Sequence, residues 1–315
     1  MDVVTFGETM VLFNPDSNGP LRYVHKFTKS IGGAESNVAI ALARLGHEVG
    51  WFSKLGNDEF GKYIKAIIRG EGVDVSRVVE DDNNVTGLVF KERFMHTDPN
   101  IYYYRKHSAT SFLNVEDINY NYIKNSKILH ITGITAALSK TSREAVFKAI
   151  EIAKKENVII SFDPNIRLKL WKIEEAKDVL LNIANKADII FPGISEAKML
   201  LGIDEPKEIT SNFLEMGCNI VAIKLGKEGC YVANRETSQF YKGYVIDKFE
   251  DTVGAGDGFA AGFLSGILQG LNIGECAQIA NAVGAMATLV RGDMEGFPTK
   301  SQVMEFMGKE KYIDR

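Results

Sequence analysis

One carboxylate, Asp257, stands among three glycines, at positions 254, 256 and 258. The residues that follow have helical apolar spacing: Phe259, Phe263, Leu264, Ile267, Leu268 and Leu271. This pattern predicts that the glycine turn lies at a helix N-terminus, where free backbone N–H groups and the helix dipole bind anions. A carboxylate at such a place would repel a bound phosphate. Its presence therefore indicates a general base that takes the proton of a hydroxyl attacking the phosphate.

A structural interpretation fits the same residues, because an aspartate in the first turn of a helix also stabilises the helix dipole. The two common phosphate motifs do not decide between these alternatives. Gly254 and Gly256 begin a dinucleotide fingerprint, but Phe259 occupies its third glycine position, and no G-x-x-x-x-G-K-[ST] sequence occurs.

The elements around this turn alternate between short apolar runs and helical patterns. The runs predict buried strands at residues 3–6, 49–52, 128–131, 158–162, 189–191 and 220–225. The helical patterns cover residues 34–45, 59–70, 141–155, 174–184, 196–201, 207–216, 258–270 and 274–290. This alternation is typical of an α/β fold with a parallel sheet, in which ligands bind beyond the C-terminal ends of the strands.

Two segments, at about 11–30 and 84–106, interrupt the alternation and are rich in aromatic and β-branched residues. Residues 87–94 and 101–105 are predicted strands, and Thr97-Asp98-Pro99-Asn100 is a plausible hairpin turn between them. We expect these segments to form a small separate sheet, and such a sheet needs a partner to bury an apolar face.

The composition is that of an ordinary globular chain, with 315 residues, 45% hydrophobic residues and 25% charged residues. A formal net charge of −4 does not favour nucleic-acid binding. The cysteines at 218, 230 and 276 have neither disulfide nor zinc spacing. The N-terminus does not resemble a signal peptide, and the most apolar region, 259–271, is too short to span a bilayer. The length allows one large domain or two small ones, and we expect a cytoplasmic protein with no association with membranes.

Residues 251–257 read D-T-V-G-A-G-D and match the signature D-T-x-G-A-G-D of the ribokinase-like (PfkB) carbohydrate kinases. The second signature of that family is similar to residues 32–39, G-G-A-E-S-N-V-A. The two motifs stand more than two hundred residues apart, in the family's order, and the resemblance covers nearly the whole chain. It implies a single domain over residues 1–315 with a three-layer α/β fold, in which helices flank a mostly parallel central sheet, and a small β-sheet lid. It also implies ATP and Mg²⁺ as cofactors and a homo-oligomer formed through the lid sheet.

For catalysis, the resemblance implies that Asp257 is the base and that the backbone of Gly254, Ala255 and Gly256 stabilises the transferring phosphoryl group. The helix N-terminus should favour the charged form of Asp257 and so weaken it as a base. Residues 224–229 read K-L-G-K-E-G and by themselves indicate an ordinary hairpin turn. The resemblance instead assigns a set of residues to the nucleotide: Asn165, Ser195, Lys224, Gly226, Lys227, Gly229, Gly254, Ala255, Gly256 and Asn281.

Two metal positions are also implied by the resemblance. Glu196 matches the acid of the family's N-x-x-E element, which organises Mg²⁺, but Gly193 replaces the asparagine. This departure favours contact with Mg²⁺ through water. Relatives often bind a monovalent cation near the signature turn, and Asp251 would be a ligand of K⁺. Each acid would otherwise be an ordinary helix or turn residue.

The residues 103–105, 163–167 and Trp171 resemble those of the 2-keto-3-deoxygluconate kinases within the family. These enzymes phosphorylate the terminal hydroxyl of an acid sugar, whose carboxylate suits arginine. The implied sugar-binding residues are Gly33, Asn37, Phe90, Tyr103, Arg105, Arg167, Asp257 and Asp293. Isolated arginines are more often found in surface salt bridges. Fructokinases and other hexose kinases share both signatures and remain an alternative, as does an inactive sugar-binding or nucleotide-binding regulator.

Overall fold

The computed structural model describes residues 1–94 and 100–309 of the chain. Its large sheet has the strand order β14-β13-β12-β11-β10-β9-β1-β4, and the strands from β12 to β4 are parallel to one another. In that order the strands are Ser238–Lys242, Gly229–Ala233, Ile220–Lys224, Ile189–Ile190, Ile159–Asp163, Ile128–Thr132, Val3–Phe6 and Val49–Phe52. The predicted parallel strands are present with small changes at their ends. The antiparallel strands β13 and β14 were not predicted, and they extend one edge of the sheet.

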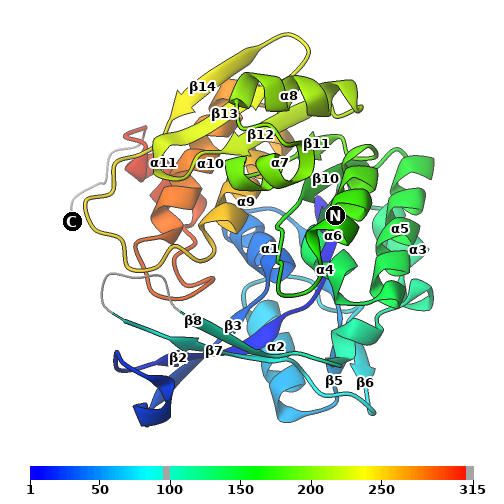
Figure 1. The fold of residues 1–315 in the computed structure, drawn as a ribbon, viewed down its shortest axis with the longest axis vertical. Coiled ribbons are helices and arrows are strands. Elements are labelled where there is room, and N and C mark those ends of the chain that lie inside the picture. The colour runs from blue at the N-terminus through cyan, green and yellow to red at the C-terminus, as the bar shows by residue number, and fades with distance from the viewer. Residues whose placement is uncertain (95–99, 310–315) are drawn as a thin grey trace.

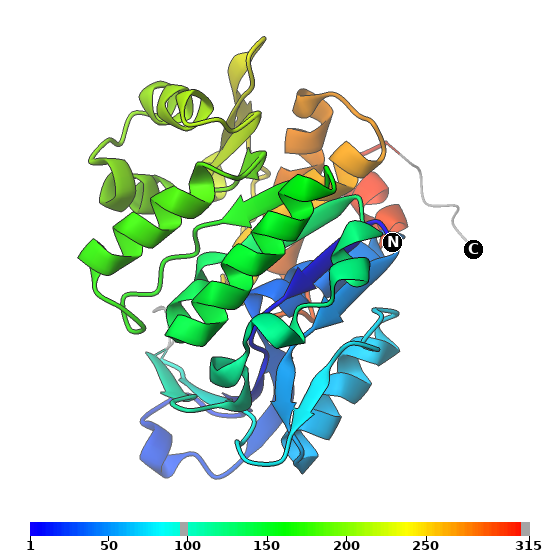
Figure 2. The ribbon, with the colours of Figure 1, turned by 90° about the vertical axis from the view of Figure 1, so that its right-hand side faces the viewer.

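Helices cover both faces of this sheet and make three layers (Figures 1 and 2). One face is packed by α5 (Lys140–Lys155), α6 (Ile173–Ala184), α7 (Ile194–Leu201) and α8 (Pro206–Glu215). The other face is packed by α1 (Ala34–Arg44), α2 (Glu59–Gly70), α9 (Ala255–Leu268) and α10 (Ile273–Ala287). The short helices are α3 (Tyr120–Lys124), α4 (Gly133–Leu138) and α11 (Lys300–Phe306). Alternate strand residues enter opposite cores: Val3 packs with α1 and α9, whereas Val4 packs with α5.

The two segments that interrupt the alternation form a four-stranded sheet with the order β3-β2-β7-β8, hereafter the small sheet. Its strands are Phe27–Gly32, Met10–Pro15, Leu88–Glu92 and Asn100–Tyr104. The strands β7 and β8 pair antiparallel, as a hairpin requires. Most of the predicted turn, at positions 97–99, lies outside the described residues. A further two-stranded sheet, β5 (Lys54–Gly56) with β6 (Val79–Asp81), was not predicted.

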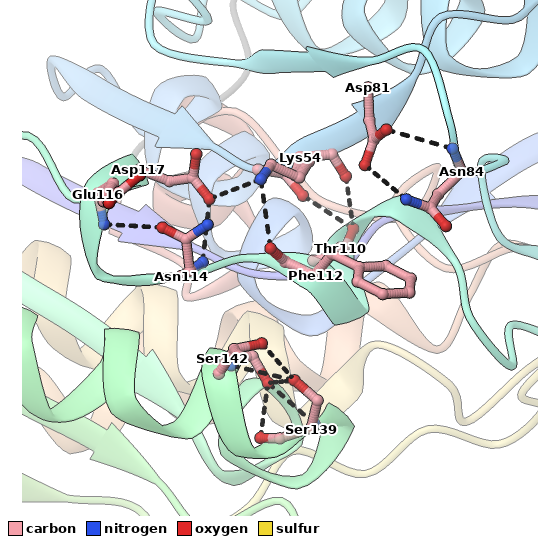
Figure 3. Close-up of polar contacts among 12 residues, drawn as sticks. Lys54, Asp81, Asn84, Thr110, Phe112, Asn114, Glu116, Asp117, Ser139 and Ser142 are labelled. Atoms are coloured by element: carbon pink, nitrogen blue, oxygen red, sulfur yellow. Dashed lines mark hydrogen bonds and ion pairs between the residues drawn. The ribbon is translucent and has the colours of Figure 1, made fainter.

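Polar contacts around Lys54 hold the segment that leads from the small sheet back to the main domain (Figure 3). The Lys54 ammonium lies 2.9 Å from an Asp117 carboxylate oxygen and donates to the Phe112 carbonyl at 3.2 Å. The Thr110 hydroxyl donates to the Lys54 carbonyl at 2.8 Å. In the same view, Ser139 caps α5 through Ser142. Because Phe112 and Ser139 both line the cavity described below, these contacts help to shape its wall.

None of the helices in residues 1–94 and 100–309 combines the length and apolar character needed to cross a bilayer.

Candidate active site

A cavity of about 1800 Å³ opens at the C-terminal ends of the parallel strands, under one face of the small sheet. Asp163 ends β10 and Lys224 ends β12, and both line this cavity. The N-terminal turn of α9 enters it from the helix layer, with Gly254, Gly256 and Asp257 among the lining residues. The small sheet closes the opposite side. The fold therefore places the glycine turn opposite the small sheet across a single cavity.

The glycine turn caps α9, which begins at Ala255 rather than at the predicted residue 258. Gly254 is the N-cap and has a φ of 84°, a left-handed conformation that favours glycine. A Cβ atom on Gly254 would lie 2.3 Å from the carbonyl oxygen of Asp293. This position thus requires glycine for two independent reasons. The Ala255 amide donates weakly to the Thr252 carbonyl, at 3.4 Å, and Ala255 does not line the cavity.

Asp257 lies in the first turn of α9 and is buried, with only 9% of its surface exposed. Its Oδ2 accepts a hydrogen bond from the Asn37 side-chain amide at 2.8 Å. Burial raises the pKa of Asp257 to about 7, and the negative charge of Asp163 acts in the same direction. The Asn37 hydrogen bond and the positive charges of Lys224 and Arg167 oppose this rise. The expectation that the helix N-terminus keeps Asp257 charged and weakens it as a base is therefore corrected, because desolvation is the largest influence on the pKa of this carboxyl.

Lys224 pairs with Asp163 beside the glycine turn, with 2.6 Å between the Lys224 Nζ and the Asp163 Oδ2. The same Nζ lies 3.6 Å from the position of a Cβ on Gly256. Burial disfavours the charged ammonium, but Asp163 and Glu196 raise the pKa of Lys224 above its ordinary value. The lysine is therefore a fixed positive charge next to the helix N-terminus, and together they make a site suited to a phosphate.

Glu196 lies in the first turn of α7 and faces the cavity. Its two oxygens accept hydrogen bonds from the backbone amides of Ile166 and Gly193, each at 2.8 Å. Each carboxylate oxygen keeps a further lone pair for a water molecule. Within residues 1–94 and 100–309 no three histidine, cysteine or acidic side chains cluster as a metal site. These donors fit a Mg²⁺ ion that keeps its waters and binds mainly to nucleotide phosphates.

All of the predicted sugar residues except Phe90 line the cavity: Gly33, Asn37, Tyr103, Arg105, Arg167, Asp257 and Asp293. Asn37 Oδ1 is buried and has no hydrogen-bond partner among the described residues, so it can accept from a ligand hydroxyl. The Tyr103 ring has Arg105 on one side, 5.4 Å from the ring centroid, and Lys169 at 5.6 Å.

The two predicted arginines have different surroundings. Arg105 lines the cavity but forms a close ion pair with Glu8, a buried carboxylate at the end of β1. Arg167 is exposed to the cavity and forms no ion pair within the part of the chain that the structure describes. Arg167 is therefore the arginine whose charge is available to a ligand.

Phe90 is not placed as predicted, because its ring lies on the face of the small sheet that points away from the cavity. It stacks on Phe13 with 4.7 Å between ring centroids and makes edge contacts with Phe27 and Tyr104. Strand alternation puts its neighbours on the opposite face. Val89 and Ile101 form the apolar wall instead.

The residues predicted for the nucleotide are only partly brought together. Asn165 and Lys224 line the cavity, and Asn165 has a positive φ of 39°. Gly254 and Gly256 also line the cavity. The remaining predicted residues are not among the lining residues: Ser195, Gly226, Lys227, Gly229, Ala255 and Asn281. The turn from Gly226 to Gly229 joins β12 to β13 as a hairpin.

Asn281 has structural partners in the next layer. Its side-chain amide donates to the carbonyls of Tyr241 and Lys242 and ties α10 to β14. The predicted contact of Asn281 with the nucleotide stays a prediction.

Asp251 is held by two cations that the sequence analysis missed. The Lys91 Nζ lies 3.1 Å from Asp251 Oδ2, and Arg93 makes a close ion pair with the same oxygen. Burial opposes ionisation, but the charges of Lys91 and Arg93 hold the pKa of Asp251 below its ordinary value. Asp251 Oδ1 accepts from the Val253 amide at 3.2 Å. These partners do not fit the predicted K⁺ ion at Asp251, because two fixed positive charges would repel it.

The sequence pattern that could have revealed this cluster lies in and just after β7. Lys91 and Arg93 stand two residues apart, which places both on one side of an extended chain. Val89, two residues earlier, belongs to the same apolar face. Buried lysine is rare unless it is paired, so the pattern predicts acidic partners but does not identify them. The Lys91 Nζ also lies 2.7 Å from Asp293 Oδ1. Asp293 therefore lines the cavity, but this ion pair already uses one of its carboxylate oxygens.

Comparison with known proteins agrees with this fold. The family model for the pfkB family carbohydrate kinases matches residues 1–300, and the chain belongs to this family. A 2-dehydro-3-deoxygluconokinase from Bacillus subtilis is 42% identical over 99% of this chain and 97% of its own length. A 5-dehydro-2-deoxygluconokinase from Clostridium perfringens is 34% identical over 98% of this chain and 94% of its own. An E. coli chain solved with ATP and Mg²⁺ is 28% identical, with a TM-score of 0.91 over 98% of this chain and 99% of that one.

Proposed function

We propose that this chain transfers the γ-phosphoryl group of ATP to the terminal hydroxyl of 2-keto-3-deoxygluconate, giving the 6-phosphate. The observation that carries the proposal is the arrangement around Asp257. A buried carboxylate with a pKa of about 7 lies at a glycine-capped helix N-terminus, in the same cavity as Lys224 and the free charge of Arg167. The B. subtilis relative, named for this reaction, supports the choice of substrate.

Asp257 acts as the general base. Its pKa lies close to neutral pH, where a base is both available and strong enough to accept a proton late in a loose transition state. Asn37 donates to Oδ2 and holds the carboxylate in one orientation. The terminal hydroxyl of the sugar attacks the γ-phosphorus as its proton passes to Asp257, the bond to the bridging oxygen breaks, and ADP leaves.

The negative charge that builds up on the phosphoryl oxygens faces positive groups of the protein. The N-terminal turn of α9 at Gly254 and Gly256 supplies backbone N–H groups, and the Lys224 ammonium supplies a full charge beside them. Mg²⁺, when bound with ATP, neutralises phosphate charge, and Glu196 is the residue that would hold it through water. The complex of ATP and Mg²⁺ with the E. coli chain of the same fold supports ATP and Mg²⁺ as the cofactors.

Recognition of an acid sugar rests on Arg167. A guanidinium without an ion-pair partner, facing a cavity, is suited to bind a carboxylate. Asn37 Oδ1 and the Gly33 backbone are placed to meet sugar hydroxyls, with Tyr103 beside them. Arg105 has its charge matched by Glu8 and acts in holding β8 against β1 rather than as the main carboxylate ligand. A guanidinium at Arg167 that binds the substrate carboxylate favours acid sugars over fructose.

The small sheet serves as a lid and as the contact between two copies of the chain. Its outer face carries the aromatic rings of Phe13, Phe27, Phe90 and Tyr104, and Tyr104 is 65% exposed. A second copy would cover this face. Light scattering on purified protein tests the contact, and a monomer at micromolar concentration would contradict it. The three cysteines are free and buried, which suits the reducing cytoplasm in which we place the protein.

The test is ADP release with ATP and Mg²⁺ against a panel of sugars. The panel contains 2-keto-3-deoxygluconate, 5-dehydro-2-deoxygluconate, fructose, ribose and adenosine, and Asp257→Asn is the control variant. We expect the first sugar to have the highest kcat/KM and the variant to lose about 100-fold or more of kcat, with ATP binding retained. A preference for fructose would support the proposed kinase activity but contradict the role of Arg167 in binding a carboxylate. A preference for 5-dehydro-2-deoxygluconate would change only the assigned substrate and leave the proposed reaction and the role of Arg167 in place.

A further inference from the structure

The glycine turn is connected to the small sheet by a buried cluster of four charges: Lys91, Arg93, Asp251 and Asp293. Lys91 is 2% exposed and bridges the two carboxylates, at 3.1 Å from Asp251 and 2.7 Å from Asp293. Arg93 forms a close ion pair with Asp251. With both carboxylates ionised, the two cations and two anions balance, and an added K⁺ would leave an uncompensated buried charge.

The cluster touches the glycine turn at two points. Asp251 Oδ1 accepts from the Val253 amide, directly before Gly254 in the chain. The Asp293 carbonyl lies against the Cα of Gly254, since a Cβ there would be 2.3 Å away. The other side of Asp293 lies against Gly32, just before α1, because a Cβ on Gly32 would be 2.5 Å from Asp293 Oδ2. Lys91 therefore acts on both glycine motifs through the two carboxylates.

We propose that Lys91, together with Arg93, takes the place of a monovalent cation at Asp251, so that phosphoryl transfer by this chain is independent of K⁺. Lys91 is then a positioning residue: its ammonium orients Asp251 and Asp293, and through them the turn that contains Asp257. Because the ammonium belongs to β7, this orientation depends on the small sheet. The inference rests on the proposed kinase function for its kinetic readout.

The first measurement compares wild-type protein in KCl and in tetramethylammonium chloride at equal ionic strength. We expect kcat and the KM for ATP to agree within about 2-fold, and the melting temperature to show no rise specific to K⁺. Activation by K⁺ of about 5-fold or more would overturn the proposal. A melting temperature that is higher in KCl than in tetramethylammonium chloride at equal ionic strength would overturn it as well. If no sugar is turned over, the proposed function fails, whereas the melting comparison still decides whether K⁺ binds.

The second measurement uses Lys91→Ala, which removes the ammonium and leaves space at the carboxylates. We expect kcat to fall about 10-fold or more, and methylammonium, but not tetramethylammonium, to restore part of it. An exposed lysine on α6, away from the small sheet, Lys177, provides the control Lys177→Ala, for which no change is expected. If Lys91→Ala folds and keeps full activity, or if both ammonium ions act alike, Lys91 does not position the turn. If the variant does not fold, Lys91→Arg must retain K⁺-independent turnover, and a K⁺ requirement in that variant would refute the replacement.

Discussion

Replacing Asp257 by asparagine should make the protein more stable at neutral pH while it removes the base. Ionised Asp257 is unfavourable in the fold because burial raises its pKa from 3.8 to about 7. The folded state therefore binds the proton more tightly than the unfolded chain. The stability contributed by protonated Asp257 is complete below the unfolded pKa and is lost as the pH rises toward the folded pKa. Asparagine keeps an oxygen that can accept the hydrogen bond from Asn37.

The size of the effect follows from the same pKa. Between about pH 5 and about pH 7, Asp257 is ionised in the unfolded chain but protonated in the fold, and each pH unit then costs about 1.4 kcal/mol. The wild type should lose about 2 to 3 kcal/mol relative to Asp257→Asn over this range. All other titrating groups are common to both proteins, so their contributions cancel in the difference.

Urea unfolding of both proteins at about pH 5 and about pH 8 measures this difference. Asp178 is exposed on α6, and Asp178→Asn is the matched control for the same substitution outside the cavity. If the stability difference between wild type and Asp257→Asn is the same at both pH values, burial does not raise the pKa of Asp257. Asp257 would then not be a base with a pKa near neutral pH.

Two further substitutions test the substrate site and the glycine turn. Arg167→Ala should raise the KM for 2-keto-3-deoxygluconate by about 10- to 100-fold, because the acid sugar loses a charged hydrogen bond. The KM for a neutral sugar should change by less than about 3-fold. Equal effects on both sugars would show that Arg167 does not recognise the carboxylate. Gly254→Ala should cost about 3 kcal/mol or more in urea unfolding, because it combines a left-handed φ with a Cβ placed 2.3 Å from the Asp293 carbonyl. Gly270→Ala, also at a positive φ but with no atom within 4 Å of its Cβ, should cost only about 1 kcal/mol. Similar losses for the two glycines would show that the contact with Asp293 is not tight.

The sequence by itself predicts most of the strands and helices of the fold, because local rules decide them. Strands that are buried on both faces appear as continuous apolar runs, such as Val3–Phe6 at β1, and amphipathic patterns mark the helices between them. The glycine turn before Phe259 is predicted at a helix N-terminus for the same reason. Only the start of that helix was misjudged, since Gly254 caps it and leaves Asp257 inside the first turn.

Which face of a strand meets the cavity was decided only by the tertiary structure. The strand β7 has large apolar side chains on both faces, so its pattern does not tell whether Val89 or Phe90 points to the cavity. The pairing of β7 with β2 and β8 settles the question and sends Phe90 outward to the other aromatic rings.

The electrostatics of the site likewise depend on contacts far apart in the chain. Asn37 meets Asp257 across 220 residues, and Lys91 meets Asp251 across 160 residues. The pKa of a carboxyl is set by how much water burial removes and by which charges lie near it, and neither quantity is local to the sequence. The sequence therefore predicted a carboxylate at a phosphate turn, but only the folded arrangement made Asp257 a base near neutral pH and gave Asp251 two cationic partners from the small sheet.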